Sequence, residues 1–372
     1  MMLYLILVLS ALFFLYIFWI GIILKGWITL PPFRLQREPA FICLSVVVPV
    51  RNEENSLPAL LEALLVQDYP PDCFEIVLVD DHSTDSTAKV INNYSNSNLN
   101  ISYIKLPVEK SGKKRAIFEG VIHSKHQFII TTDSDSVMGP NWLKEFSSYY
   151  FQHKPSLIAG PVLFKEDSTF TGSILQLELI SLVSSTAGAI NAKVPVMCSG
   201  ANLAFEKEVY MKVQKEIKWN IESGDDVFLL HAVAGLGKER IHFIKSINSL
   251  VYIFPEKTVK GFFNQRVRWA SKSRYYIRFS AVFTAILVLL INISLAALFF
   301  SGFFNPELMK LFGVFFIIKT IVDFPLLYNA SVFFNKLKLI FFLIPAQFIY
   351  FLYVTAVFVL SIFMKYSWKS RY

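Results

Sequence analysis

Long uncharged apolar runs constrain this chain more than any other feature. Residues 1–24 carry no charge and are rich in Leu, Ile and Phe, and two further uncharged runs cover residues 279–306 and 339–364. At a rise of 1.5 Å per residue, each run is long enough to cross a hydrocarbon core of about 30 Å as a helix. The first run lacks the basic start and short apolar core of a signal peptide, so we expect a retained N-terminal transmembrane anchor over residues 1–24.

A fourth apolar run, residues 308–334, is interrupted by Lys319, Asp323 and Pro325. Lys319 and Asp323 are four residues apart, so on a helix they share a face and can neutralise each other inside a bundle. We therefore predict a packed helix here, with a re-entrant hairpin as the alternative. Residues 279–364 then form a C-terminal transmembrane region of about three spans, which makes four spans in all.

The net charge of +8 is concentrated in one segment. Residues 257–278 contain no acid and seven basic residues: Lys257, Lys260, Arg266, Arg268, Lys272, Arg274 and Arg278. A basic stripe directly before an apolar run is typical of a membrane flank rather than of a nucleic-acid-binding face. The stripe predicts an interfacial amphipathic helix over 257–278, a lipid bilayer as partner and no nucleic acid.

The basic residues also predict the orientation. Positive charges follow the first span and precede the second, which places the region between them in the cytoplasm. We thus expect a multi-pass protein of the plasma or inner membrane with a cytoplasmic domain. The residues after the first span that carry this argument are Lys25, Arg34 and Arg37, whereas the C-terminal basic residues would lie outside, against the rule: Lys365, Lys369 and Arg371.

The region between the anchors, residues 41–255, has the pattern of an α/β domain. With 54% hydrophobic residues the chain is too apolar to be disordered. Apolar, β-branched runs alternate with helical patterns, which predicts a mainly parallel sheet covered on both faces. We expect strands at 41–50, 74–79, 101–106 and 128–132, and helices after Ser56, near 85–93 and at 113–123.

Acidic pairs follow two of these strands. Asp80 and Asp81 end the second strand, and Asp133 and Asp135 follow the fourth. Ligands of parallel sheets bind beyond the carboxyl ends of the strands, and two carboxylates on one turn can bind a divalent cation that keeps positions open for phosphate oxygens. Alternatively, each pair is a turn whose aspartates bond their own backbone. His82 beside Asp81 has no second histidine nearby, which argues against a metal ligand.

Two later patterns have similar alternatives. Asp225 and Asp226 precede an apolar helical pattern, so they are either a helix N-cap or carboxylates aimed at a cleft, where one serves as a general base. Gln265, Arg268 and Trp269 share one helix face. That face is either a binding surface or part of an interfacial helix with snorkelling arginines and a belt tryptophan.

Taken in order, these motifs resemble a known family. The series VVPVRNEE, VDDHSTDST, TDSDS, CSGAN, GDDVFL and QRVRW resembles the family 2 glycosyltransferases, in particular their membrane-bound branch with the Gln-x-x-Arg-Trp signature. That branch includes polysaccharide synthases and enzymes like ceramide glucosyltransferase. The resemblance covers about residues 45–269. It implies an α/β domain of the GT-A type, the nucleotide-diphospho-sugar transferase fold, inserted between transmembrane helices.

The resemblance also implies roles in donor binding. Asp81 would contact the nucleoside with help from Asp80. Asp135 would bind Mg²⁺ or Mn²⁺ at the diphosphate, with Asp133 in support. Lys113, in the segment SGKKR, matches the Gly-Lys step of the family.

Further roles concern the acceptor. Asp226 would be the general base for the acceptor hydroxyl, although Asp225 replaces the usual Glu and leaves open which aspartate is the base. Gln265, Arg268 and Trp269 would close over the diphosphate and the acceptor. The acceptor entrance would be lined by Ser199, Gly200 and Asn202. A second departure from the pattern is His82, which stands where the family usually has Gly.

The function that this resemblance implies is an inverting glycosyltransferase. It would move a sugar from a nucleotide-diphosphate donor to a lipid-linked or membrane-proximal glycan acceptor. A processive polysaccharide synthase is the alternative within the same family. Outside that family, the motifs are compatible with a non-catalytic membrane protein that keeps the nucleotide-binding fold, or with a nucleotidyltransferase.

Overall fold

The computed structural model consists of two compact units. An α/β unit contains Leu30–Lys165 and Met197–Phe254, and a helical unit contains Met1–Thr29, Glu166–Val196 and Pro255–Tyr372. The residues that the structure describes are 2–35, 41–94, 100–165, 167–219, 221, 223–237, 240–256 and 258–363.

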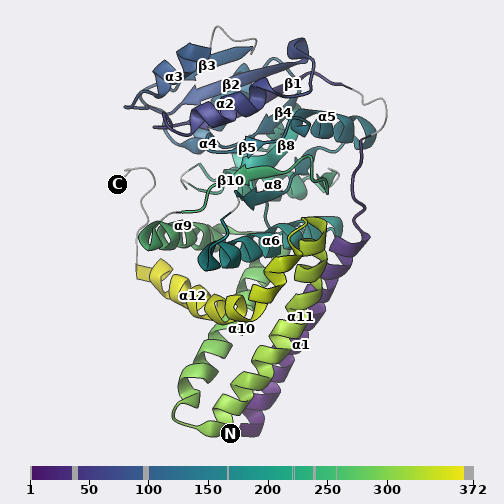
Figure 1. Ribbon diagram of the computed structural model, residues 1–372, viewed down its shortest axis with the longest axis vertical. Coiled ribbons are helices and arrows are strands. Elements are labelled where there is room, and N and C mark those ends of the chain that lie inside the picture. Colours follow the sequence, from purple (N-terminus) through teal and green to yellow (C-terminus); the bar gives the residue numbers. More distant parts are fainter. Residues whose placement is uncertain are drawn as a thin grey trace. The chain divides into compact units, whose positions relative to one another are not determined.

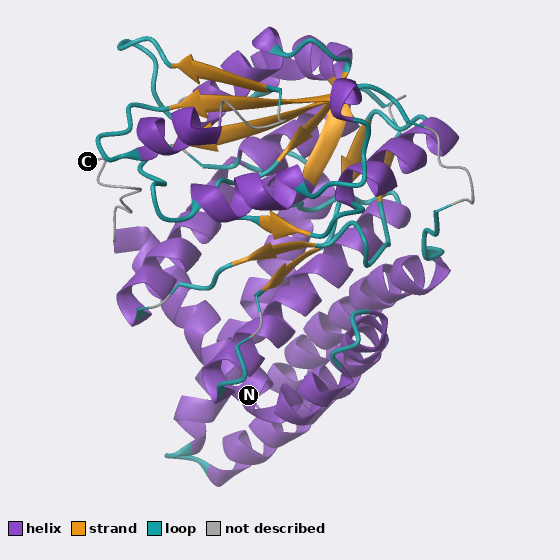
Figure 2. Ribbon diagram, turned by 45° about the horizontal axis from the view of Figure 1, so that its top comes forward, coloured by secondary structure: helices purple, strands orange, loops and turns teal. Residues whose placement is uncertain are grey.

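The main sheet of the α/β unit confirms the predicted fold class. Its strand order is β3-β2-β1-β4-β8-β6-β9, and β3, β2, β1 and β4 run parallel, whereas β8 is antiparallel to both of its neighbours. The sheet is therefore mixed and mostly parallel (Figure 2). The bounds are β1 Leu44–Val50, β2 Phe74–Asp80, β3 Ile101–Lys105, β4 Phe128–Thr131, β6 Leu157–Ala159, β8 Leu203–Glu206 and β9 Ile241–Phe243.

A smaller sheet of three strands completes this unit. Its order is β5-β10-β7, with β10 antiparallel to β5 and parallel to β7. The bounds are β5 Val137–Met138, β7 Val162–Phe164 and β10 Val251–Ile253.

Alternation along β1 explains why helices cover both faces of the main sheet. Val46 and Val48 lie in a buried cluster with Leu60 of α2 and Trp142 of α5. Val47 points the other way, toward α4, and a Cβ on Gly120 of that helix would come within 2.4 Å of the Val47 side chain. The helices are α2 Leu57–Leu65, α3 Thr87–Tyr94, α4 Lys113–His123, α5 Trp142–His153, α7 Lys207–Val213 and α8 Asp225–Gly235, with short 3₁₀ turns at Pro71–Cys73, Gly200–Asn202 and Gln214–Glu216.

The first four predicted strands and the three helices between them are present with small shifts at their ends. Helix α4 has the predicted bounds, 113–123. Helix α2 starts directly after Ser56, but the Ser56 hydroxyl bonds the Glu53 carboxylate instead of capping the helix. Residues 95–99, between α3 and β3, lie outside the described residues.

Among its described residues, the helical unit contains five helices that are long and apolar enough to cross a membrane, which indicates a membrane protein. Four of them match the predicted spans. Figure 1 labels the helices of this unit. Their bounds are α1 Met2–Thr29, α6 Phe170–Asn191, α9 Val259–Ser271, α10 Phe279–Gly302, α11 Pro306–Phe333 and α12 Leu343–Phe363, with 3₁₀ turns at Lys272–Tyr275 and Leu337–Phe342.

Helix α6 differs from the prediction. Residues 41–255 are predicted to form one domain, whereas α6 groups with the apolar helices. Its backbone crosses α1 closely: a Cβ on Gly26 would lie 2.1 Å from the Gly188 carbonyl oxygen. Asn191 then donates to the Gly26 carbonyl at 2.9 Å. Small residues permit this approach, and the packing along α1 explains why α6 belongs to this unit.

The predicted Lys319–Asp323 pair is confirmed. Lys319 Nζ lies 2.8 Å from Asp323 Oδ2, and α11 is one continuous helix through Pro325 rather than a re-entrant hairpin. Gln347 of α12 accepts from Lys319 at 2.5 Å and donates to Asp323 at 2.7 Å. Tyr16 of α1 donates to the other Asp323 oxygen at 2.5 Å. This polar cluster therefore joins three apolar helices.

Within the basic stripe, helix α9 covers Val259–Ser271 and a 3₁₀ turn covers Lys272–Tyr275. Several basic residues on which the predicted membrane orientation depends lie outside the described residues: Arg37, Lys257, Lys365, Lys369 and Arg371. The structure therefore does not test that orientation.

Candidate active site

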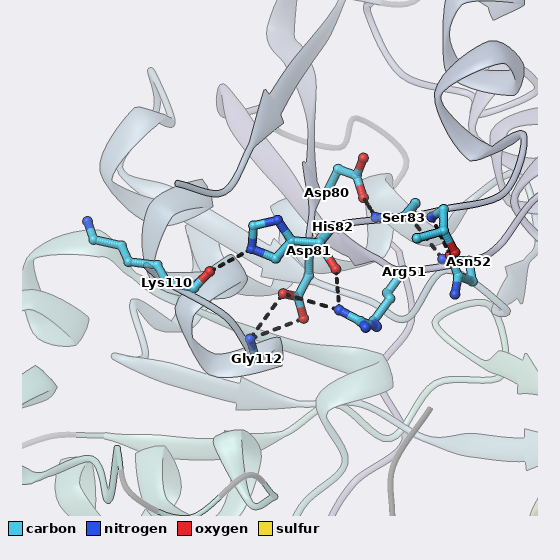
Figure 3. A network of polar contacts seen from close by, with 9 residues as sticks. Arg51, Asn52, Asp80, Asp81, His82, Ser83, Lys110 and Gly112 are labelled. Carbon is cyan, nitrogen blue, oxygen red and sulfur yellow. Dashed lines mark hydrogen bonds and ion pairs between the residues drawn. The ribbon is translucent and has the colours of Figure 1, made fainter. Parts of the chain in front are cut away.

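The turn after β2 holds a buried carboxylate at its centre. Asp81 is 2% exposed, and both of its carboxylate oxygens accept from the Gly112 backbone N–H, at 3.2 and 3.1 Å. Arg51 Nη1, after β1, donates to the Asp81 carbonyl at 2.7 Å and lies 3.9 Å from the carboxylate (Figure 3). The charge of Asp81 is thus balanced from two neighbouring loops at the carboxyl end of the sheet.

Asp80 has a different role in the same turn. Its Oδ1 accepts from the Ser83 backbone N–H at 2.8 Å, and its Oδ2 accepts from the Tyr103 hydroxyl at 2.8 Å. Burial, and then the adjacent Asp80 carboxylate, raise the pKa of Tyr103 above the ordinary value for tyrosine. Asp80 therefore acts as the turn-forming aspartate of the alternative interpretation, and Asp81 is the one that points to the Gly112 loop.

Lys113 brings two distant acidic motifs together. Its Nζ lies 2.6 Å from Asp133 Oδ1, after β4, and 3.4 Å from Asp225 Oδ2, at the start of α8. Burial disfavours the ammonium, but the Asp133 and Asp225 carboxylates outweigh that effect and raise the pKa of Lys113 above its ordinary value. These carboxylates therefore favour the charged form of Lys113.

The second carboxylate of α8 contacts the CSGAN segment. Asp226 Oδ2 accepts from the Gly200 backbone N–H at 3.2 Å. A Cβ on Gly200 would lie 2.9 Å from Asp225 Oδ2 and 3.5 Å from the Asp226 Cβ. Glycine thus permits the close approach of this segment to both aspartates. A small cavity beside them is lined in part by Thr131, Gly200, Tyr210, Asp225 and Asp226.

The other two predicted acceptor residues lie around this contact. Asn202 is fully buried: its amide donates to the Pro161 and Ser249 carbonyls at 2.7 and 2.8 Å and accepts from Trp142 at 3.0 Å. These bonds connect the 3₁₀ turn that contains Asn202 to the segments around Pro161, Ser249 and Trp142. Ser199 accepts from the Ala201 N–H at 3.4 Å and begins the 3₁₀ turn that contains Gly200.

The carboxylates that follow β4 can hold a hard cation only together with a bound ligand that supplies further oxygen atoms. Asp133 and Asp135 are both partly exposed, and no group of three or more His, Cys, Asp or Glu among the described residues is arranged to hold a metal ion. Mg²⁺ in phosphate-transfer sites is usually held by one or two carboxylates together with substrate phosphates. The two aspartates are carboxylates of the kind that such a site uses and would be its protein ligands, and Asp133 is paired with Lys113 in this structure.

The Gln-x-x-Arg-Trp residues lie on α9, in the helical unit. Gln265, Arg268 and Trp269 are all partly exposed. Sequence reasoning missed the residue between them, Arg266, which is 5% exposed and pairs with Glu178 of α6 at 2.7 Å. Its guanidinium lies 4.4 Å from the centre of the Trp269 ring. Nothing in a stripe of seven basic residues distinguishes this buried arginine from its solvated neighbours.

The fold and these strand-end aspartates define a class of protein, the GT-A-like α/β domains. A solved structure supports this: the mannosyltransferase PcManGT from Pyrobaculum calidifontis, in complex with GDP-Man and Mn²⁺, aligns over 95% of this chain and 95% of its own, with a TM-score of 0.60 and 16% identity. At that identity the likeness shows the fold alone.

Sequence comparison then gives the family. Residues 45–213 match the model for Glycosyl transferase family 2. The poly(ribitol-phosphate) β-N-acetylglucosaminyltransferase TarS of Staphylococcus aureus is 32% identical over 115 residues, 31% of this chain and 20% of TarS. The poly-β-1,6-N-acetyl-D-glucosamine synthase of Staphylococcus epidermidis is 25% identical over 238 residues, 61% of this chain and 53% of the synthase. Residues 45–213 therefore form a domain of glycosyltransferase family 2, and the chain spans about half or less of the length of these relatives.

Proposed function

We propose that this protein is an inverting glycosyltransferase that moves a sugar from a nucleotide-diphosphate donor to a lipid-linked or membrane-proximal acceptor. The observation that carries the proposal is the meeting of Lys113, Asp133 and Asp225 beyond the carboxyl end of β4. A cation and carboxylates from three separate motifs converge where α/β sheets bind their ligands.

The donor would bind at the turns after β1, β2 and β4. Asp81 would contact the nucleoside, while Asp135 with Asp133 would hold Mg²⁺ or Mn²⁺, which neutralises phosphate charge. Lys113 lies within reach of the same position and would bind the departing diphosphate electrostatically. Asp80 would act indirectly, by holding the turn through Ser83 and Tyr103.

The transfer step needs one base. Asp226 would take the proton of the acceptor hydroxyl, the oxygen would form a bond to the anomeric carbon, and the electron pair of the breaking bond would leave on the diphosphate. Direct displacement inverts the anomeric carbon. Asp225 already pairs with Lys113, whereas Asp226 contacts Gly200 in the segment assigned to the acceptor. This contrast favours Asp226 as the base.

The acceptor would be presented at the membrane. The five apolar helices favour a lipid-linked or membrane-proximal glycan over a soluble acceptor, and the net positive α9 carries the Gln265, Arg268 and Trp269 side chains proposed to close over the diphosphate. A cytoplasmic orientation of the α/β unit in the plasma or inner membrane completes the proposal.

A processive polysaccharide synthase is the second candidate. It is favoured by the similarity to the poly-β-1,6-N-acetyl-D-glucosamine synthase, which extends over 61% of this chain. The two candidates share the donor chemistry and differ in product length.

One experiment tests both. Membranes that contain the full chain are incubated with Mn²⁺ and a panel of radiolabelled nucleotide sugars, and nucleoside diphosphate release is measured together with the label in the organic phase. We expect release and an organic-extractable glycolipid. A high-mass polymer would select the synthase instead. No release with any donor above the level of matched Asp226→Asn membranes would contradict both candidates.

A further inference from the structure

His82 has a backbone conformation that a side chain rarely adopts. Its φ is +59°, in the left-handed region, directly after the buried carboxylate of Asp81. For most residues with a Cβ this region costs about 1–2 kcal/mol, and glycine occupies it freely. Histidine is less favourable than glycine for this backbone conformation, so a contact made by its side chain would have to compensate.

The imidazole contacts a loop that is distant in sequence. His82 Nε2 lies 2.9 Å from the Lys110 carbonyl oxygen (Figure 3). Because a carbonyl oxygen only accepts, Nε2 is the nitrogen that carries the proton. The Lys110 backbone N–H in turn donates to the Pro107 carbonyl at 2.9 Å, so this bond reaches the turn that begins the loop between β3 and α4.

Two consecutive residues of the β2 turn thus hold one loop at two points. Asp81 accepts from the Gly112 N–H, and His82 donates to the Lys110 carbonyl. The next residue after Gly112 is Lys113, whose ammonium reaches Asp133 and Asp225. The position of Lys113 therefore depends on how the preceding loop is anchored.

We propose that His82 is a positioning residue that anchors the 106–112 loop and thereby presents Gly112 and Lys113 to the nucleotide-sugar donor. This inference rests on the proposed function for its substrate, but the anchoring itself does not. The hydrogen bond of the imidazole would compensate for the backbone strain at His82, because it links the turn after β2 to the loop that precedes Lys113. A glycine at this position would have no side chain to form that link.

The decisive variant is His82→Gly, because it separates the backbone from the bond. Glycine adopts the +59° φ without strain and cannot reach Lys110, so thermal stability should stay at or above that of the wild type while the loop is released. A net hydrogen bond of typical strength corresponds to roughly a two- to tenfold change in an equilibrium. We expect the KM for the donor to rise by that factor, with a smaller change in kcat.

Loop release has a readout that does not need enzymatic activity. In limited trypsin digestion of the full chain, followed by mass spectrometry, cleavage after Lys110 should be faster in His82→Gly by roughly two- to tenfold. Cleavage after Lys125, an exposed lysine of the same unit, is the internal control and should not change. If the wild type proves inactive with all donors but the cleavage differs as expected, the anchoring stands and the proposed function fails.

Two further variants complete the test. His82→Asn tolerates the left-handed region and keeps an N–H donor, so it should recover part of both effects. His82→Ala keeps the strain and loses the bond, so it should be less stable than His82→Gly. An unchanged rate of cleavage after Lys110 in His82→Gly, or an unchanged donor KM beside faster cleavage, would overturn the proposal.

Discussion

Two lysines in this molecule each lie beside carboxylates, and their surroundings differ in a way that separates structure from function. Lys319, in the helical unit, is 3% exposed and contacts Asp323 and Gln347. Lys113, in the α/β unit, contacts Asp133 and Asp225, whose side chains are 32% and 14% exposed.

The difference lies in the balance of charge. At Lys319 one ammonium meets one carboxylate, and Gln347 and Tyr16 bond the same Asp323. At Lys113 one ammonium meets two carboxylates, and the charge of Asp226 acts on it as well. A balanced buried pair holds helices together, whereas a partly exposed surplus of negative charge can still bind a cation.

The largest effect that we expect is on catalysis. Asp226→Asn keeps the shape of the side chain but cannot accept the proton of the acceptor hydroxyl, so transfer should fall by about 10²- to 10⁴-fold. Donor binding should persist. The measurement is kcat in the transfer assay together with the affinity for a nucleoside diphosphate. Asp225→Asn is the matched control, and a larger loss of kcat in that variant would move the base to Asp225.

The next effect is on the stability of the helical unit. Lys319→Met leaves the Asp323 carboxylate, whose side chain is only 14% exposed, without its counter-charge, which should lower the free energy of unfolding by about 3 kcal/mol. The double variant Lys319→Met/Asp323→Leu removes both charges and should recover most of that loss. Unfolding in detergent, followed by circular dichroism, measures both. Equal stability of the single and double variants would show that the pair is not the reason for the loss.

Ligand-induced stabilisation sharpens the same comparison. A nucleoside diphosphate with Mn²⁺ at about 100 times its Kd should stabilise the wild type by about 2.7 kcal/mol. Asp135→Asn removes a predicted metal ligand and should abolish most of this gain, whereas the Lys319→Met/Asp323→Leu variant should retain it. The measurement is the thermal shift with and without EDTA. A full shift in Asp135→Asn would remove that residue from the metal site.

Much of this contrast could be predicted from sequence, because it depends on local periodicity. A spacing of four residues puts Lys319 and Asp323 on one helix face, and alternating apolar runs predict parallel strands whose ends carry Asp81 and Asp133. The bounds of α4 follow from the same pattern. These properties depend on neighbours in sequence, which a single chain displays directly.

The remaining features depend on contacts that sequence spacing does not encode. The burial of Arg266 against Glu178 and the full enclosure of Asn202 arise from tertiary packing. Helix α6 was missed although it is apolar, because it interrupts an α/β pattern that predicts a single domain. The Lys113 bridge could be suspected only through its resemblance to a family motif, since Asp133 and Asp225 are far apart in the chain.

The smallest expected effect is the stability change on removing Lys113. The side chains of Lys113 and Asp133 are 19% and 32% exposed, whereas those of Lys319 and Asp323 are 4% and 14% exposed, so Lys113→Met should change the free energy of unfolding by only about 1 kcal/mol. The Asp133 and Asp225 carboxylates raise the pKa of Lys113 against the effect of burial. A raised folded-state pKa gives a contribution that is complete below the unfolded value of about 10.4 and is lost as the pH rises through the folded value. The stability difference between the wild type and Lys113→Met should therefore be constant from about pH 6 to 9, which denaturant titrations at several pH values can measure. A loss as large as that of Lys319→Met would mean that the cluster in the α/β unit is a structural pair, and the distinction between the two lysines would fail.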